Sequence, residues 1–202
     1  CFSEHPIEEN QYGRLSMWRA YGGDRPVALV LNNGPLLSDT DVFHADTNPV
    51  SYLDPAEFSK EFHQLSLRIN SDKVFIKKLG KEKVIDYLFD TFKNFVLCVK
   101  HPGFKEEREW RVVYNPTEQV STHVASSIEV INGVPQEVFK IPLQDIPEES
   151  FYGATVPEFI HKIIIGPCSQ QAVLRQTFLK ILEDAGCKNP YSKIHHSGIP
   201  LI

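Results

Sequence analysis

The 202-residue sequence has no run of about 20 apolar residues, the length that a membrane-spanning helix needs. It has no excess of positive charge either: 21 Lys and Arg against 26 Asp and Glu give a net charge of −5, which argues against a broad surface for nucleic acid. The N-terminal pattern of a signal peptide is absent as well. We therefore expect a soluble, cytoplasmic protein with no membrane partner.

Cysteine and histidine do not show the spacing of metal ligands. The four cysteines are scattered, and of the eight histidines only His195 and His196 are neighbours. On a strand those two side chains would face opposite ways, so we expect no metal site. Cys98 and Cys168 lie in or at the end of apolar runs, where a buried thiol is the usual outcome. Unpaired cysteines fit a reducing compartment.

Two motifs of catalytic and nucleotide-binding sites are also missing. No Gly-x-Ser-x-Gly segment is present, which disfavours a serine hydrolase of the nucleophile-elbow type. No glycine-rich phosphate loop of the dinucleotide or P-loop type occurs, and Gly22-Gly23 is better explained as the stop of a short helix over residues 15–21.

Apolar residues at spacings of three and four predict two long amphipathic helices. The first begins at Pro55 and includes Phe58 and Phe62, and the second contains Phe92 and Phe95. Core packing explains this aromatic stripe better than a cofactor site does. Between the two helices, residues 73–81 mix lysines with Phe75. This basic cluster fits either contact with nucleic-acid phosphates or the solvated end of a helix.

Several strands are indicated by short apolar runs. Residues 27–31 form a continuous apolar run and predict a strand buried on both faces, and residues 159–165 predict another buried strand. Around Asn132-Gly133 we expect an antiparallel strand pair with a loop longer than two residues. Ser169 is expected to cap a helix that stops at Gly186. A last strand is expected near residues 193–195.

No repeat, low-complexity tract or linker divides the chain, so we predict a single domain over residues 1–202. Cys1-Phe2-Ser3 reads like the end of a strand already under way, and we expect an N-terminal segment to be missing. The expected fold class is α+β, with a mixed, largely antiparallel sheet and flanking helices.

The most informative segment is Lys105–Arg111, which follows a loop and opens a strand. In an extended chain Glu107 and Glu109 share a face with Arg111. Two carboxylates so placed raise one another's pKa, which suits general-base chemistry or the binding of a sugar hydroxyl, and Arg111 can offset the repulsion. The alternative is a solvated strand edge with cross-strand ion pairs.

Five short segments, in this order, resemble a family of bacterial domains of unknown function, DUF2971. They are Cys1-Phe2-Ser3, Met17-Trp18 with Tyr21, Glu107-x-Glu109-Trp110-Arg111, Ile160-x-x-Ile163-Ile164-Ile165-Gly166, and Ser197-Gly198-Ile199-Pro200. The family's layout is similar to the ADP-ribosyltransferase fold, and NAD would then be the substrate. The first-strand His or Arg of that fold has no counterpart in this sequence.

The resemblance implies a role for each residue of the motif. Glu109 would be the catalytic carboxylate that stabilises the oxocarbenium-like state formed when the nicotinamide bond breaks, and Glu107 would orient or deprotonate the acceptor. The cofactor-binding residues would be Ser3, Trp18, Tyr21 and Arg111. The alternative is that Trp18 is a core aromatic and that Ser3 only caps a turn.

Three function classes follow. The first is an NAD-dependent ADP-ribosyltransferase acting on an unknown acceptor, in a bacterial toxin or phage-defence setting. The second is a non-catalytic binding module, a sensor or antitoxin-like partner that keeps the fold without the chemistry. The third is a nucleic-acid-binding domain that uses the basic cluster at residues 73–81. An enzyme needs Glu109 in a concave pocket with a perturbed pKa, whereas a binding module tolerates its loss.

Overall fold

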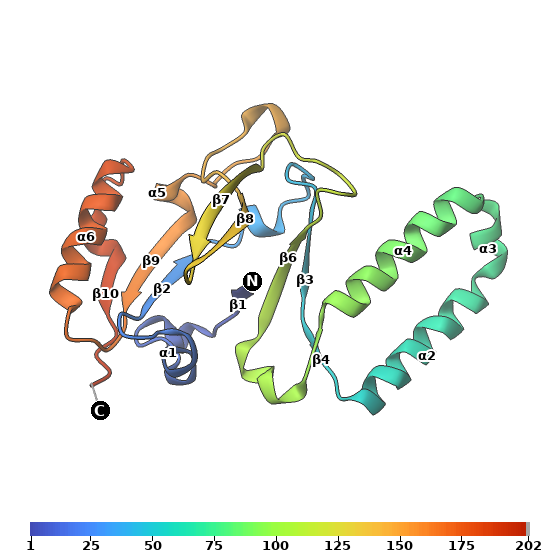
Figure 1. Cartoon of the computed structure of the whole chain (residues 1–202), viewed down its shortest axis with the longest axis horizontal. Helices are drawn as coiled ribbons and strands as arrows, with labels where there is room; N and C mark the ends of the chain where they lie inside the picture. Colours follow the sequence, from blue (N-terminus) through green and yellow to red (C-terminus); the bar gives the residue numbers. More distant parts are fainter. Residues whose placement is uncertain (201–202) are drawn as a thin grey trace. The chain divides into compact units, whose positions relative to one another are not determined.

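The computed structural model describes residues 1–200, which form short strands and helices (Figure 1). The strands are β1 Phe2–Ser3, β2 Val27–Leu31, β3 Ala45–Pro49, β4 Ser51–Tyr52, β5 Val99–Lys100, β6 Glu109–Tyr114, β7 Ala125–Ile131, β8 Val134–Lys140, β9 Ile160–Ile165 and β10 Ile194–His196. The α-helices are α1 Leu15–Tyr21, α2 Pro55–Ser71, α3 Lys73–Lys78, α4 Lys81–Leu97, α5 Val156–Phe159 and α6 Gln171–Asp184. The 3₁₀ helices are η1 Ile7–Asn10, η2 Pro35–Leu37, η3 Pro102–Glu107, η4 Pro147–Glu149 and η5 Pro190–Lys193. The predicted α+β class is confirmed.

The strands are divided among four small sheets rather than gathered in one. Their orders are β1-β6-β3, β10-β9-β2, β4-β5 and β7-β8. The pairs β1/β6, β2/β9 and β7/β8 are antiparallel, whereas β4/β5 and β9/β10 are parallel. The mixed, mainly antiparallel character is therefore as predicted. Within residues 1–200, no helix is both long and apolar enough to cross a membrane.

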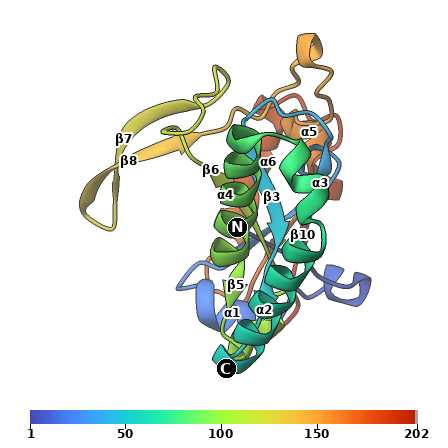
Figure 2. The ribbon, with the colours of Figure 1, turned by 90° about the vertical axis from the view of Figure 1, so that its right-hand side faces the viewer.

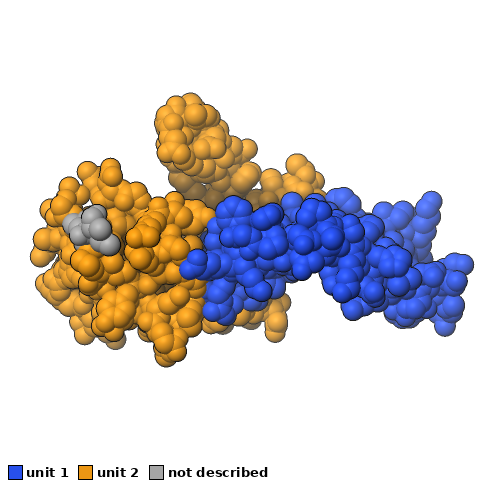
Figure 3. Space-filling model, turned by 90° about the horizontal axis from the view of Figure 1, so that it is seen from below, with its two compact units in different colours: residues 1–4, 46–112 blue, residues 5–45, 113–202 orange. Residues whose placement is uncertain are grey.

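The chain forms two compact units (Figure 3). Unit 1 consists of Cys1–Glu4 and Asp46–Val112, and unit 2 consists of His5–Ala45 and Val113–Ile202. The single domain over residues 1–202 stays a prediction, and its last two residues lie outside the described part of the chain.

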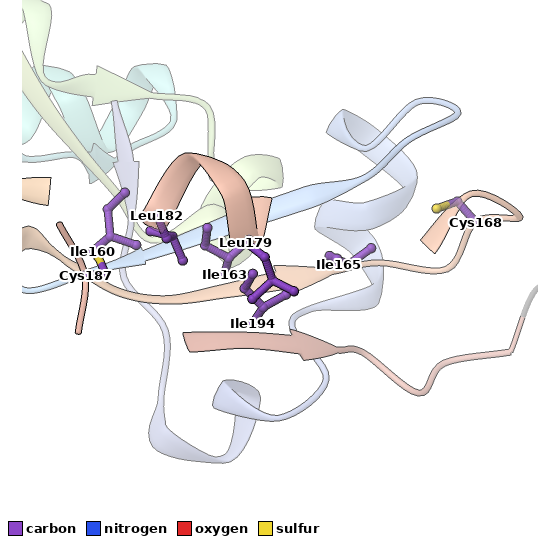
Figure 4. Packing of buried hydrophobic residues seen from close by; sticks show 8 residues of the cluster. All are labelled: Ile160, Ile163, Ile165, Cys168, Leu179, Leu182, Cys187 and Ile194. Carbon is purple, nitrogen blue, oxygen red and sulfur yellow. The ribbon is translucent and has the colours of Figure 1, made fainter. Parts of the chain in front are cut away.

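Unit 2 contains the main hydrophobic core, and β9 lies at its centre. Apolar side chains from β9 pack against α6 and β10 (Figure 4); the buried members are Ile160, Ile163, Ile165, Cys168, Leu179, Leu182, Cys187 and Ile194. The predicted buried strand over residues 159–165 is therefore confirmed. The strand predicted over residues 27–31 is also present, but its burial on both faces was wrong. β2 is an edge strand, and Leu29 is about half exposed.

Two further local expectations in unit 2 were wrong. Asn132 and Gly133 alone connect β7 to β8, and their φ angles of 52° and 81° are those of a tight type I′ turn, so the loop is not longer than two residues. Gln170, not Ser169, is the residue at the N-terminal boundary of α6, and its side chain forms no cap. The helix does stop just before Gly186, whose φ of 82° favours glycine.

Unit 1 contains a helical hairpin in which α2 and α4 lie side by side and α3 connects them (Figures 1 and 2). Asp54 starts α2 with a capping box, since its side chain accepts from Ala56 and Glu57 while the Glu57 side chain accepts from the Asp54 amide. The helices meet through aromatic rings, with Phe58 and Phe95 centroids 5.0 Å apart and Phe62 and Phe92 centroids 5.7 Å apart. The stripe thus packs between α2 and α4, as predicted, but none of its residues is buried.

Candidate functional site

The acidic motif lies where β6 begins in unit 1. Ser3 of β1 pairs directly with Glu109 of β6, and the Val50 amide donates to the Glu109 carbonyl oxygen at 2.8 Å. The expectation of an extended chain through residue 107 was wrong. Glu107 ends a 3₁₀ helix, and Arg108 has a left-handed backbone with φ of 46°. The strand therefore starts at Glu109, after a turn that was not predicted from the sequence.

Glu107 and Glu109 nevertheless come together through a shared cation. The Lys100 ammonium lies 2.5 Å from a carboxylate oxygen of Glu107 and 3.0 Å from Oε2 of Glu109. Nε of Arg111 donates to the other oxygen of Glu109 at 2.9 Å. The Glu109 side chain is only 9% exposed. The four residues, which we call the ion cluster, balance two negative charges against two positive ones.

The ion cluster keeps its members charged. Hydrogen bonds from Arg111, and then from Lys100, hold the pKa of Glu109 below its ordinary value of 4.5, against the effect of burial. The same contacts raise the pKa of Lys100, where the bond to Glu107 is the largest cause. The sequence pattern had suggested that the paired carboxylates raise one another's pKa. For Glu109 the direction is the opposite, because two cations lie closer to it than the pattern implied.

Polar groups from distant segments fix the backbone around the cluster. The Glu109 amide donates to the Tyr52 hydroxyl at 2.7 Å, and the Ser3 hydroxyl donates to the Glu107 carbonyl oxygen at 2.5 Å. Sequence reasoning missed Tyr52 and Lys100. In the sequence, Tyr52 lies just before Pro55, where the first predicted helix begins, and Lys100 lies shortly after the second predicted helix, and neither position indicates a site. Ser3, which the resemblance implied as a cofactor-binding residue, is thus placed beside Glu107 and Glu109.

Trp18 and Tyr21, the other two implied cofactor-binding residues, belong to α1 in unit 2. Trp18 is buried, and its Nε1 donates to the Tyr12 carbonyl oxygen at 2.9 Å. Gly13 and Gly166 lie close to its ring. Tyr21 is largely exposed at the end of the helix. The contacts of Trp18 are those of a packing residue within unit 2.

A pocket of about 380 Å³ lies in unit 1 beside the ion cluster. Its lining comes from β3, β4, β5 and one side of the helical hairpin: Asn48, Pro49, Ser51, Glu61, Gln64, Leu65, Arg68, Thr91, Asn94, Phe95, Cys98 and Val99. The Oδ1 atom of Asn94 is buried and has no hydrogen-bond partner among the described residues. A buried acceptor without a partner costs about 1–3 kcal/mol. Asn94 is therefore the lining residue with the most to gain from a ligand.

The chain segment from Cys98 to Lys100 connects the pocket with the ion cluster. Cys98 and Val99 line the pocket, whereas the next residue, Lys100, binds both carboxylates. Arg111 also donates to the Leu97 carbonyl oxygen at the end of α4. Burial raises the pKa of the Cys98 thiol, so this cysteine is neutral at physiological pH. The cluster thus holds the wall of the pocket in place.

Within residues 1–200 no group of three or more His, Cys, Asp or Glu side chains is arranged to hold a metal ion.

Comparison with known proteins gives one match. Residues 17–112, slightly under half of the chain, match the model of a family described as "Protein of unknown function (DUF2971)". No curated protein and no solved structure matches the chain. The matched segment includes Met17, Trp18 and the Glu107–Arg111 motif, but nothing in the comparisons supports the similarity to ADP-ribosyltransferases. Over residues 17–112 the chain is therefore similar to the DUF2971 family, as its sequence motifs had indicated.

Proposed function

We propose that the protein is a non-catalytic binding module, whose unit 1 holds a small polar molecule in the pocket beside the ion cluster. The observation that carries this proposal is the state of Glu109: both of its carboxylate oxygens already accept hydrogen bonds from cations. A carboxylate that stabilises an oxocarbenium-like state acts through its negative charge. Arg111 and Lys100 offset that charge within the protein.

In contrast to Glu109, several polar side chains of the pocket form no hydrogen bond or ion pair within the described part of the protein. Glu61, Gln64 and Arg68 follow one another on α2 at spacings of three and four, so they share one face of the helix. None of these three side chains forms a hydrogen bond or ion pair with another described residue. Together with Asn94 they present donors and acceptors to the same space. The volume is within the range of small-molecule sites, about 300–1,000 Å³.

The binding proposal is tested by thermal denaturation of the full chain with a panel of small polar molecules, including NAD and nicotinamide. We expect at least one compound to raise the melting temperature in a saturable way. Arg68→Ala should abolish the rise, whereas Lys60→Ala, on the same helix but outside the pocket lining, should keep it. A rise that survives Arg68→Ala would contradict this pocket as the site.

A second candidate is NAD-dependent ADP-ribosyl transfer by a cytoplasmic bacterial protein in a toxin or phage-defence setting. The β1/β6 register favours it, because Ser3 lies directly opposite Glu109. The resemblance implied that these two residues belong to the same site. In this case Glu109 and Glu107 would be catalytic, with Arg111 beside the substrate. The acceptor would be a separate molecule.

The transferase candidate is tested by following nicotinamide release from NAD, with and without cell extract as a source of acceptor. Release by the wild-type protein that disappears in Glu109→Gln, while a Glu4→Gln control remains active, would favour the transferase. Glu4 pairs with Arg108 on a more exposed surface of the same unit. Wild-type protein that binds a ligand but releases no nicotinamide would favour the binding module.

A further inference from the structure

The helical hairpin of unit 1 leaves a stripe of apolar side chains in solvent. None of its residues from Pro55 to Leu97 is buried. On α4, Ile85, Phe89 and Val96 are 54%, 56% and 61% exposed. At 3.6 residues per turn these three side chains lie within an arc of about 40°. We call them the α4 stripe.

The α4 stripe lies beside the aromatic seam between the helices, not in it. Phe92 and Phe95 make the contacts with α2, and Phe62 remains 42% exposed although its ring contacts both of them. The ammonium of Lys93 lies 5.9 Å from the centroid of the Phe89 ring, so charge borders the stripe on one side. The hairpin therefore packs its seam only partly away from solvent, and the adjoining apolar surface has no partner among residues 1–200.

Charge is distributed unevenly along the same hairpin. The tip, residues 66–85, carries six basic and two acidic side chains, a net charge of +4. The root, residues 54–65 and 86–97, carries five acidic and two basic side chains, a net charge of −3. One hairpin thus has a positive half and a negative half along the length of its two 17-residue helices, about 25 Å each.

We propose that the helical hairpin docks on the hairpin of a second copy of this chain, antiparallel and with the tip of each copy against the root of the other. A two-fold interface uses the same patch on both copies, and an antiparallel arrangement places +4 against −3 twice. Two amphipathic hairpins that bury their exposed apolar sides together form a four-helix bundle. A face about 25 Å long and two helices wide has the order of size of a standard interface, about 800 Å² per partner.

This interface is distinct from the pocket. Thr91 and Asn94, which line the pocket, lie roughly 140–160° around α4 from the α4 stripe. The dimer would leave the pocket open, so formation of the dimer does not depend on the proposed ligand.

The first test is sedimentation velocity of the full chain at about 100 µM, where a functional dimer of micromolar affinity is fully formed. We expect a dimer for the wild type and at least a tenfold higher dissociation constant for Phe89→Lys. Tyr87→Lys is the matched control, because Tyr87 is also exposed on α4, at 60%, but lies about 180° from the stripe. Far-UV circular dichroism checks that all three proteins keep their helices.

The second test reverses charge and does not depend on the stripe. A tip variant, Lys77→Glu with Lys81→Glu, brings the net charge of the tip from +4 to 0, and a root variant, Asp86→Lys with Asp90→Lys, brings that of the root from −3 to +1. Each variant should dissociate, because the attraction between tip and root is then lost. An equal mixture of the two should associate again as a heterodimer. A monomeric wild type, a dimer that survives Phe89→Lys, or a mixture that stays monomeric would each overturn the proposal. So would binding of the monomer to nucleic acid that Phe89→Lys abolishes, since the α4 stripe would then serve another partner.

Discussion

At the scale of single residues, Glu109 forms ion pairs with two cations in a largely buried site of unit 1. Its carboxylate is almost fully removed from water and receives one cation on each oxygen. The alternation of side chains correctly placed Glu109 beside Arg111, whereas Glu107 joins them from a 3₁₀ helix through Lys100. It could not supply Lys100 or Tyr52, because the Tyr52 hydroxyl reaches the Glu109 amide from 57 positions earlier in the chain. Such partners are determined by tertiary packing, which local alternation does not encode.

The first prediction concerns the loss of this charge. Glu109→Gln removes the negative charge and one of the two acceptor oxygens that Lys100 and Arg111 use, in a site shielded from solvent. We expect it to lower the free energy of unfolding by about 2–4 kcal/mol, since removing one member of a buried ion pair leaves the other uncompensated. Urea denaturation measures the change. Glu129→Gln, which removes an exposed ion pair with Lys140, is the control and should change stability little.

The second prediction is a pH dependence of that stability. The pKa of Glu109 is lower in the folded protein than its ordinary value of 4.5, so the unfolded chain takes up a proton first as the pH falls. The contribution of Glu109 is complete above about pH 4.5 and is lost progressively below it. The stability difference between wild type and Glu109→Gln should therefore shrink on going from neutral pH to pH values below 4.5. A difference that stays constant over this range would contradict the assignment.

At the scale of elements, sequence patterns located the longer helices and several strands within a few residues, whereas α3 and α5 were not predicted. The helices predicted from Pro55 and through Phe95 became α2 and α4, and the run at residues 27–31 became β2. For β2 the predicted exposure was wrong, not the position. A continuous apolar run looks the same in a central strand and in an edge strand, and only the strand order shows that β2 lies at an edge.

The third prediction compares two glycines that both have ordinary helical φ angles. A Cβ at Gly22 would lie 2.5 Å from the Trp18 carbonyl oxygen and 2.6 Å from Pro26 Cβ, whereas a Cβ at Gly34 meets nothing within 4 Å. We expect Gly22→Ala to destabilise the protein by about 2 kcal/mol, because backbone and a packed proline must move. Gly34→Ala should be neutral or stabilise by up to about 1 kcal/mol. Thermal denaturation of the two variants measures both effects, and equal melting temperatures would contradict the packing around Trp18.

At the scale of the whole molecule, hydrophobic burial is distributed unequally between the two units. Both clusters of buried apolar residues belong to unit 2, whereas the helical hairpin of unit 1 buries none of its residues. Neither the division into two units nor the four separate sheets was predicted. Both depend on which distant strands pair, as β2 does with β9, and apolar periodicity carries no information about the partner.

The fourth prediction follows from this inequality. Amides of α2 and α4 should exchange with deuterium at least tenfold faster than those of β9 and α6, because local opening of the hairpin exposes little apolar surface. Hydrogen exchange followed by mass spectrometry makes the comparison, and α6 is a helical control with buried Leu179 and Leu182. If the hairpin dimerises, its exchange should slow as the protein concentration rises, while that of α6 stays constant. Equal protection of the two helical regions in the monomer would contradict the prediction.

The order in which the two units are completed along the chain has a consequence for synthesis on the ribosome. The last residue of unit 1 is Val112, so all of its segments have been made before β9 exists. β2 is made early but pairs with β9, and its apolar residues 27–31 have no native partner while the intervening chain is translated. Nascent chains with exposed apolar strands are the ones that chaperones bind. We therefore expect the nascent protein to hold a folded unit 1 and an unpaired β2 at the same time, with β2 as the segment that needs protection.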